Sequence, residues 1–493
     1  MMKINKNIFL LLGPLVFVCM QLLGTPENMP EPAYDVLCAT IWIALWWITE
    51  VVPIAVTALL PIILFPLMGA VDISTTTASY GHKYIFLYMG GFMLAIAIEK
   101  WNLHKRMALH IIKLIGTNVN NIILGFMIAT AFLSMWISNT ATSVMMLPIG
   151  MSIVSQLKDN PSTVEDENKT FGKALMLSIA YSASIGGIAT LIGTPPNLVF
   201  AGYVQEIYGI EISFFQWLKF GLPIAVGLLI IGWYYLTHIA FKFKQKSFPG
   251  GKQEINRLVE ELGPMKPEEK TVLIIFVITA FCWISRSFIL TRFLPGIDDT
   301  IIAMVAGISL FIIGSSGKGK RLIYWEDAVK MPWGIILLFG GGMALASGFE
   351  ITGLAAWFGQ QMTLLQTLPL ILLVFIVIFC VNFITELTSN LATTAMLLPI
   401  LAPIALKLDL NPYMLLVATT VAASCAFMLP VATPPNAVVF GSGYLRIPDM
   451  VKAGVWMNII SILILSAMVY FMLPLIWGFD PLEFSQQFVT AKH

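Results

Sequence analysis

Two short polar motifs lie inside long apolar stretches of the sequence, and each motif occurs twice. The longer one reads SMWISNTATSVMMLP from Ser134 to Pro148 and returns as TELTSNLATTAMLLP from Thr385 to Pro399, with seven of fifteen aligned residues identical. The shorter one reads GTPPN from Gly193 to Asn197 and returns as ATPPN from Ala432 to Asn436. The chain is therefore internally repeated, and the polar residues of the motifs are its first candidates for chemistry.

The motifs contain residue types that begin helices. Ser138, Asn139 and Thr140 are N-cap residue types and stand directly before the helical run ATSVMMLPI. Thr194 can cap a helix whose first position is Pro195, where the missing N–H of proline is no loss. The second copies repeat this arrangement, so we expect four half-helices to begin at the four motifs.

Four such helix starts that meet would form a binding site for an anion. Each start supplies free backbone N–H donors and a partial positive charge, and together they hold an anion without lysine or arginine. None of the four motifs contains either basic residue. An anion with two negative charges would still be poorly compensated, so cations bound beside it would help.

Oxygen donors for such cations are abundant in the two longer motifs. They include carbonyl groups freed where helices break, and the side chains of Ser134, Ser138, Asn139, Thr385, Thr388, Ser389 and Asn390. This neutral oxygen set suits sodium, whereas zinc would require a cluster of histidine or cysteine that the sequence does not contain. We therefore expect sodium as the coupling ion and no further cofactor.

Simpler interpretations compete for some polar residues. Serine and threonine in membrane helices often only bond to the backbone or hold helices together, but two copies in register, each followed by TPPN, favour a functional role. Glu386, beside the second long motif, is either a proton carrier or a structural brace, and we expect the brace. Glu50 stands at a helix end, where we expect an interfacial residue.

The elements that position these motifs are membrane helices. With 58% hydrophobic and 11% charged residues, the 493-residue chain differs from soluble domains, which average about 25% charged residues. We predict an all-α polytopic protein in the cytoplasmic (inner) membrane, surrounded by the lipid bilayer. The net charge of +1 gives no indication of a nucleic-acid partner.

Apolar runs predict about eleven transmembrane helices, each needing about 20 residues. Two further apolar stretches, 121–156 and 369–406, contain the Ser-Asn motifs at mid-length, which a helix facing lipid would not tolerate. Each of these stretches is predicted to be a re-entrant hairpin. The crossings are 8–24, 36–50, 52–71, 84–100, 172–204, 213–241, 271–290, 300–315, 333–350, 412–440 and 453–477.

The basic residues indicate the orientation. With the N-terminus in the cytoplasm and the C-terminus outside, the cytoplasmic loops hold 22 of the 28 lysines and arginines. The helix ending at Glu99 then runs inward before the first hairpin, and the helix ending at Glu350 runs outward before the second. The repeat is therefore inverted, an architecture of secondary transporters whose broken helices meet near the middle of the bilayer.

At these motifs the sequence resembles the divalent anion/sodium symporter family. The resemblance spans nearly the whole chain and rests on SNTAT at Ser138, SNLATT at Ser389, GTPPN at Gly193 and ATPPN at Ala432. Bacterial members of that family import C4-dicarboxylates, and animal members carry dicarboxylates, citrate or sulfate. The resemblance implies a homodimer and an elevator-type transporter, in which a transport domain slides against a scaffold.

The resemblance also implies how the chain is divided. The scaffold would comprise residues 1–116 and, after a cytoplasmic linker, the rest of 243–360. The transport domain would comprise 117–242 and 361–493, and each of these segments would hold one hairpin, one broken helix and the helix that follows.

The functional residues of the family map onto the repeated motifs. Substrate carboxylates would meet Ser138, Asn139, Thr140, Thr194, Pro195, Ser389, Asn390, Thr433 and Pro434. One sodium ion would meet Ser134, Ser138, Asn139 and Gly193, and the other would meet Thr385, Thr388, Asn390 and Ala432. The second motif departs from the first at Leu391, which cannot offer the hydroxyl that Thr140 offers.

The leading hypothesis is import of a C4-dicarboxylate (succinate, fumarate or malate) driven by sodium. Sodium-independent dicarboxylate exchange and symport of citrate or sulfate are alternatives within the same family. An intramembrane hydrolase with Ser138 or Ser389 as nucleophile is disfavoured, because no histidine or lysine lies near either motif to act as base. We therefore predict that the protein is not an enzyme. A channel would not need two inverted hairpins.

Overall fold

The computed structural model describes residues 6–116, 118–158, 165–243, 250–316, 320–361 and 368–482. Within these ranges the regular secondary structure is helical, and an isolated β-bridge joins Gly314 and Arg321. The helices of the first half are α1 Lys6–Leu23, α2 Glu31–Thr49, α3 Ile54–Thr57, α4 Leu60–Leu67, α5 Ile73–Ala78, η1 Ser79–Gly81, α6 Lys83–Lys100, α7 Leu103–Ile115, α8 Val119–Ser134, α9 Asn139–Lys158, α10 Glu165–Ile188, α11 Pro195–Tyr208, α12 Phe214–Tyr234 and η2 Tyr235–Ala240.

The second half begins with a surface helix and then repeats the order of the first half. Its helices are α13 Gly251–Glu261, α14 Pro267–Ser285, η3 Arg286–Leu290, α15 Thr291–Phe293, α16 Asp299–Ile312, α17 Trp325–Ala328, α18 Trp333–Ile351, α19 Leu354–Gln361, α20 Leu370–Ile384, α21 Asn390–Lys407, α22 Tyr413–Ala423, α23 Pro434–Phe440, α24 Ile447–Ala467, η5 Met468–Met472 and α25 Leu473–Trp477.

These helices make a multi-pass membrane protein, as predicted. In the described part of the chain, eight helical segments are long and apolar enough to cross a membrane, and six shorter apolar helices accompany them. Each of the eleven predicted crossings corresponds to a helix or to a broken pair of helices. The short helices α3 to α5, which interrupt the third crossing and the loop after it, were not predicted.

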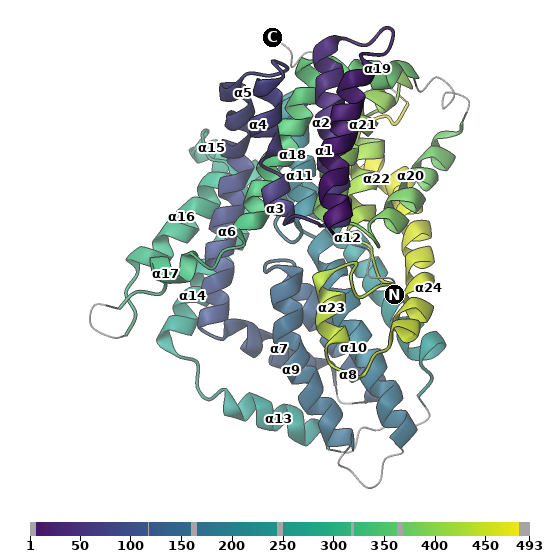
Figure 1. The fold of residues 1–493 in the computed structure, drawn as a ribbon. Helices are drawn as coiled ribbons and strands as arrows, with labels where there is room; N and C mark the ends of the chain where they lie inside the picture. Colours follow the sequence, from purple (N-terminus) through teal and green to yellow (C-terminus); the bar gives the residue numbers. More distant parts are fainter. Residues whose placement is uncertain are drawn as a thin grey trace.

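The two Ser-Asn motifs form the tips of two helical hairpins. α8 and α9 make the first hairpin, with its turn at 135–138, and α20 and α21 make the second, with its turn at 385–389. In Figure 1 the arms α8 and α9 lie in the lower half of the molecule, whereas α21 runs through the upper half. The hairpins therefore reach the middle from opposite sides, as an inverted repeat requires.

A broken helix follows each hairpin, and its second half reaches across to the other repeat. α10 ends at Ile188 and α11 begins at Pro195, while α22 ends at Ala423 and α23 begins at Pro434. α11 packs against α21 of the second hairpin, and α23 packs against α9 of the first. In Figure 1, α10 and α23 lie in the lower half and α11 in the upper half. The repeats are thus interlocked at mid-molecule, which brings all four motifs together.

The remaining helices cover the two hairpins unequally. α18 packs against α11 and α21, whereas its repeat counterpart α6 packs chiefly against α16. A Cβ added at Gly342 of α18 would lie 2.8 Å from the Ala395 Cβ of α21, so these helices are in close contact. The stripe of α21 that includes this contact is buried, and it consists of Leu391, Ala395 and Pro399. Its repeat counterpart on α9 is exposed, and it consists of Thr140, Val144 and Pro148.

Candidate functional site

A cavity of about 650 Å³ lies where the two hairpin tips and the two helix breaks meet. All nine residues that the sequence suggested for the substrate line this cavity: Ser138, Asn139, Thr140, Thr194, Pro195, Ser389, Asn390, Thr433 and Pro434. They come from both repeats and are separated by as much as 296 positions along the chain, from Ser138 to Pro434. The fold therefore assembles one site from four distant motifs.

Four helices begin at the cavity, as the N-cap residues predicted. α9 begins at Asn139, and Ser138 Oγ accepts a hydrogen bond from the Ala141 N–H at 3.3 Å. α23 begins at Pro434, and Thr433 Oγ1 accepts from the Asn436 N–H at 3.3 Å. α11 and α21 also begin here, so their first-turn N–H groups and positive helix ends face the cavity region.

One detail of the capping prediction is wrong. Thr194 occupies the N-cap position of α11, but its side chain makes no capping hydrogen bond. The Asn197 N–H donates instead to the Thr194 carbonyl at 3.2 Å, so the turn closes through the backbone. Ser389, at the N-cap of α21, also lacks a side-chain capping bond.

The asparagines of the TPPN motifs hold the two helix breaks in shape. Asn197 Nδ2 donates to the Thr190 carbonyl at 2.7 Å and lies within 3.3 Å of two more carbonyls, those of Gly187 and Ile188. Asn436 Nδ2 donates in the same way to the Leu429 carbonyl at 3.0 Å and to the Ala426 carbonyl at 3.3 Å. Both side chains are fully buried. Each satisfies carbonyl groups that the broken helix leaves without a partner.

Behind the first hairpin tip, four oxygen atoms from three segments come together. Asn139 Oδ1 faces Ser134 Oγ at 2.6 Å, the Ala183 carbonyl at 3.1 Å and the Gly193 carbonyl at 3.3 Å. An amide oxygen surrounded by acceptors is unfavourable unless a cation lies among them. Without a cation the rotated amide is the better arrangement, because Nδ2 then donates to the same three oxygens.

The second hairpin tip repeats this cluster. Thr385 Oγ1 lies 2.7 Å from Asn390 Oδ1 and 3.0 Å from the Ala423 carbonyl. The single hydroxyl proton of Thr385 can satisfy only one of these two oxygens. Thr385 is fully buried, as is its counterpart Ser134. The clusters are thus equivalent positions of the two repeats.

The residues suggested for sodium occupy two layers. Ser138, Asn139, Thr388, Asn390 and Ala432 line the cavity itself. The others lie behind its wall: Ser134, Gly193 and Thr385. The Thr388 hydroxyl already has two partners, because it lies 2.5 Å from Thr393 Oγ1 and donates to the Ile384 carbonyl at 3.0 Å.

The sequence did not identify the two carbonyl groups that complete the clusters, those of Ala183 and Ala423. A backbone oxygen leaves no residue signature, but an Ala-Ser pair occurs at both places, Ala183-Ser184 and Ala423-Ser424. The hydroxyls of Ser184 and Ser424 are both buried and have no hydrogen-bond partner within the described ranges. The repeated Ala-Ser pair was the feature of the sequence that could have pointed to these two carbonyl groups.

The wall of the cavity opposite the motifs was also not predicted. It consists of residues that precede or begin α3 and α18, namely Glu50, Ile54, Ala55, Pro332, Gly334, Ile335 and Leu338. Glu50 was expected to be interfacial, but it lines the cavity instead. This position follows from the end of α2 at Thr49, where the chain turns through a left-handed conformation with φ of 46° at Glu50.

Glu386 lies beside this site and is bonded only to donors. It is buried, with 3% of its surface exposed, and its carboxylate accepts from three backbone N–H groups and from Asn458 Nδ2. These contacts fit the structural brace that we expected of this residue.

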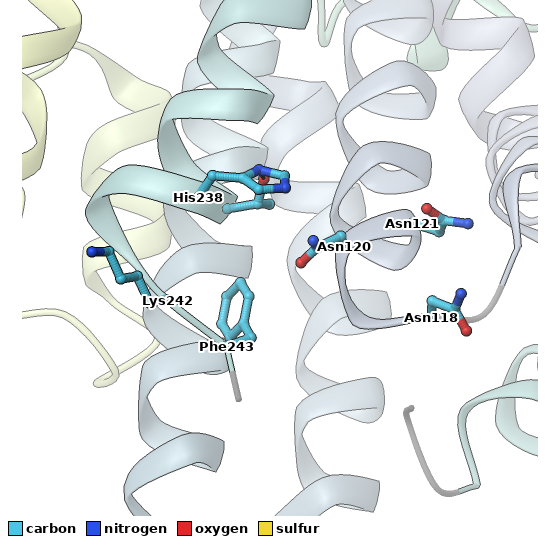
Figure 2. Close-up of a pocket in the computed structure, with 7 residues that line it drawn as sticks. Asn118, Asn120, Asn121, His238, Lys242 and Phe243 are labelled. Carbon is cyan, nitrogen blue, oxygen red and sulfur yellow. Dashed lines mark hydrogen bonds between the residues drawn. The ribbon is translucent and has the colours of Figure 1, made fainter. Parts of the chain in front are cut away.

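A second cavity, of about 480 Å³, lies between the start of α8 and the end of η2 (Figure 2). It is lined by Asn118, Asn120, Asn121, Thr237, His238, Lys242 and Phe243. In Figure 2 Lys242 points away from the three asparagines. Thr237 Oγ1 and His238 Nδ1 are 2.8 Å apart and satisfy one another. The polar groups do not converge on a common point, so this cavity is not the candidate site.

Comparison with known sequences gives one family and a group of similar transporters. Residues 5–477 match the protein family described as the sodium:sulfate symporter transmembrane region. The chain is 46% identical over 485 residues to the sodium-dependent dicarboxylate transporter SdcS of Staphylococcus saprophyticus, covering 97% of this chain and 93% of that protein. It is 45% identical over 482 residues to SdcS of Staphylococcus aureus, with the same coverage.

Comparison with solved structures gives transporters of similar fold. The YdaH transporter of Alcanivorax borkumensis matches with a TM-score of 0.61 at 13% identity, covering 92% of this chain and all of that one. MtrF of Neisseria gonorrhoeae matches with a TM-score of 0.57 at 11% identity, covering 94% and 98%. At this identity the likeness concerns the fold alone.

Proposed function

The chain belongs to the sodium:sulfate symporter family of transporters, and from this premise we propose that it imports a C4-dicarboxylate (succinate, fumarate or malate) together with sodium. It is a transporter and not an enzyme. The observation that carries the proposal is the single cavity built from both motif pairs, with an oxygen cluster behind each hairpin tip. The name of the 46% identical relative supports the choice of substrate and ion.

The four helix starts would bind the two carboxylates. Helix N-termini stabilise negative charge, and hydroxyl and amide groups at the tips add donors to either end of the substrate. Ser138, Asn139 and Thr140 would hold one carboxylate, together with Thr194 and Pro195 at the start of α11. The counterparts Ser389, Asn390, Thr433 and Pro434 would hold the other. A C4 chain with a carboxylate at each end matches this two-ended arrangement.

The two oxygen clusters would bind sodium. At the first cluster the Asn139 amide would turn its Oδ1 inward, and the ion would lie among the oxygens of Ser134, Asn139, Ala183 and Gly193. At the second it would lie among those of Thr385, Asn390 and Ala423, near Thr388 and Ala432. Among the residues lining the cavity, Glu50 is the charged one and it is negative. The dianion would therefore need these cations for charge compensation.

The two hairpins are buried to different extents by the neighbouring helices, and this difference supports alternating access. The α21 stripe is buried against α18, with Ala395 2% exposed, whereas Val144 in the counterpart stripe of α9 is 52% exposed. Because the repeats are inverted, the opposite state would expose the α21 stripe and cover the α9 stripe with α6. We propose that sliding of residues 117–242 and 361–493 against the scaffold exchanges these contacts, as in an elevator. The homodimer implied by the family resemblance remains part of this proposal.

Uptake of labelled succinate into proteoliposomes tests the proposed function. Uptake should be driven by an inward sodium gradient and should fall to background when choline replaces sodium. Competition by unlabelled fumarate, malate, citrate and sulfate would define the substrate class. Equal uptake with and without sodium, driven only by a preloaded dicarboxylate, would instead establish exchange.

A further inference from the structure

The two helix breaks differ in length, and the longer one needs an additional anchor. The unwound segment of the first repeat covers six residues, 189–194, whereas that of the second covers ten, 424–433. Each added residue brings a backbone carbonyl, and each except Pro430 also brings an N–H. These groups must find partners inside the protein. Asn436 Nδ2 donates to two of the carbonyls, but Asn436 Oδ1 has no hydrogen-bond partner in the described part of the chain, so this side chain does not satisfy the N–H groups at 427–429.

Glu386 supplies the acceptor for these N–H groups. One of its oxygens, Oε1, accepts from the Phe427 N–H at 2.7 Å and from the Met428 N–H at 2.9 Å. The other oxygen accepts from the Leu429 N–H at 3.1 Å. One carboxylate thus binds three consecutive backbone donors of the longer segment.

The same carboxylate connects this segment to two helices. Asn458 of α24 donates its Nδ2 to Glu386 Oε1 at 2.8 Å. One turn earlier on α20, Asn382 Nδ2 donates to the Cys425 carbonyl at 2.7 Å. The segment is therefore fixed from α20 on one side and from α24 on the other, with Glu386 as the charged member of the network.

This network belongs to the second repeat only. The position equivalent to Glu386 in the first repeat is Met135, whose uncharged thioether is only a weak acceptor. The shorter first segment is tied there through Thr190 Oγ1, which donates to the Met135 carbonyl at 2.5 Å. An ionised carboxylate suits the second repeat because all four bonded partners are donors.

We infer that Glu386 is a positioning residue, whose ionised carboxylate fixes the segment that carries Ala432 and Thr433 into the binding cavity. Leu429, its last partner, is three residues from Ala432, so loss of the anchor would displace this wall of the second cation and substrate site. The inference rests on the proposed function for its effect on sodium, but the anchor itself can be tested without transport. Glu386 also follows Thr385 directly, so its charge favours a cation at the second oxygen cluster.

The first arm of the test measures release of the segment with a natural reporter. Cys425 lies in the segment and is fully buried, and Cys38 on α2 is equally buried and serves as the internal reference. In the purified protein, Glu386→Gln should increase the rate at which a maleimide labels Cys425 by about tenfold or more, as expected when bonds to a charged acceptor are weakened. Labelling of Cys38 should not change. Glu99→Gln, at an exposed carboxylate, is the matched control.

The second arm measures sodium activation of succinate uptake. Glu386→Gln should raise the sodium concentration for half-maximal uptake by about tenfold, and Glu386→Asp, which keeps the charge, should restore part of the affinity. Asn458→Ala, which removes one of the four donors, should give a smaller change in the same direction even if Glu386→Gln does not fold. Unchanged Cys425 labelling together with unchanged sodium activation would overturn the inference. Absence of sodium activation in the unmodified protein would refute the proposed function, and the labelling arm would still decide the anchor.

Discussion

Asn139 and Asn390 occupy the same place in the two repeats, at the first position of α9 and of α21. Each carboxamide lies between the cavity and an oxygen cluster, and each approaches a hydroxyl of the preceding arm, Ser134 or Thr385, at 2.6 and 2.7 Å. A carboxamide can turn its oxygen toward a cation and its nitrogen toward a carboxylate. At the scale of single residues, these two side chains are therefore the link between the proposed ion and substrate sites.

Removal of either carboxamide should stop transport. Asn139→Ala and Asn390→Ala should each reduce succinate uptake by at least about 100-fold. Each substitution removes a carboxamide that contributes to the proposed ion site and to the proposed substrate site together. Size-exclusion profiles should remain those of the unmodified protein. Asn120→Ala, in the same hairpin but at the second cavity, is the matched control and should keep near-normal uptake. Near-normal uptake in either site variant would contradict the assignment.

At the scale of elements, the site depends on close approach between α8 and α10. A Cβ added at Gly186 would lie 2.3 Å from the Ala131 carbonyl oxygen and 2.5 Å from its Cα. Both atoms belong to backbone, so the two helices would have to separate. This contact lies one turn from the Ala183 carbonyl of the first oxygen cluster, so packing and site geometry are coupled here.

Gly186→Ala should therefore destabilise the protein and weaken uptake. We expect a loss of about 1–3 kcal/mol, the usual result of overpacking a close contact, seen as a lower thermal midpoint in detergent. Gly227→Ala on α12 is the control, because a Cβ there meets nothing within 4 Å and the helix gains up to about 1 kcal/mol. Equal midpoints for the two variants would show that the close approach does not matter.

Cysteine pairs can trap the two states in which either α18 covers α21 or α6 covers α9. Gly342→Cys with Ala395→Cys should form a disulfide in the state in which α21 packs against α18. A Cβ at Gly342 would lie 2.8 Å from the Ala395 Cβ, so the helices need to separate by only about 1 Å to reach the usual disulfide Cβ–Cβ distance of about 3.8 Å. The repeat-equivalent pair, Gly91→Cys with Val144→Cys, should form a disulfide only in the opposite state. Both pairs should block uptake until a reductant is added. Failure of the 91/144 pair under every sodium and substrate condition would contradict the exchange of contacts.

The sequence indicated most of these elements because their causes are local. The lengths of the apolar runs predicted the crossings, and N-cap residue types predicted helix starts at the first hairpin tip and at Pro195. The structure begins α11 at Pro195 and α9 at Asn139, two residues before the helical run that the sequence indicated. The carbonyls of Ala183 and Ala423 could not be predicted, since any residue type provides a backbone oxygen. Pro332 and its neighbours in the opposite wall depend on packing between distant helices, which no local pattern encodes.

At the scale of the whole molecule, the charged helix α13 marks one side. In Figure 1 α13 lies at the bottom with the arms of the first hairpin, whereas α5 and α19 lie at the top. The bottom is the side where the predicted cytoplasmic loops gather. We therefore propose that this side faces the cytoplasm.

Thiol labelling in intact cells tests this orientation. In a background without the exposed Cys19 and Cys380, Lys407→Cys at the end of α21 should react with an impermeant reagent from outside. Lys252→Cys on α13 should react only after permeabilisation, because it belongs to the linker that is predicted to be cytoplasmic. The reverse pattern would overturn the proposed orientation, and with it the inference from the distribution of lysine and arginine among the loops.

Cations and a dianion share one site in the proposed transport mechanism, and calorimetry of succinate binding over a sodium series tests this coupling most directly. With choline as the replacement ion, succinate affinity should rise with sodium, and sodium affinity should rise with succinate by the same factor. A coupling of typical size, about 1–3 kcal/mol, corresponds to a change of about 5- to 150-fold. Thr385→Val should reduce this factor, because Thr385 lies behind the cavity wall and contributes only to the second oxygen cluster. A succinate affinity that stays constant across the sodium series would contradict the account.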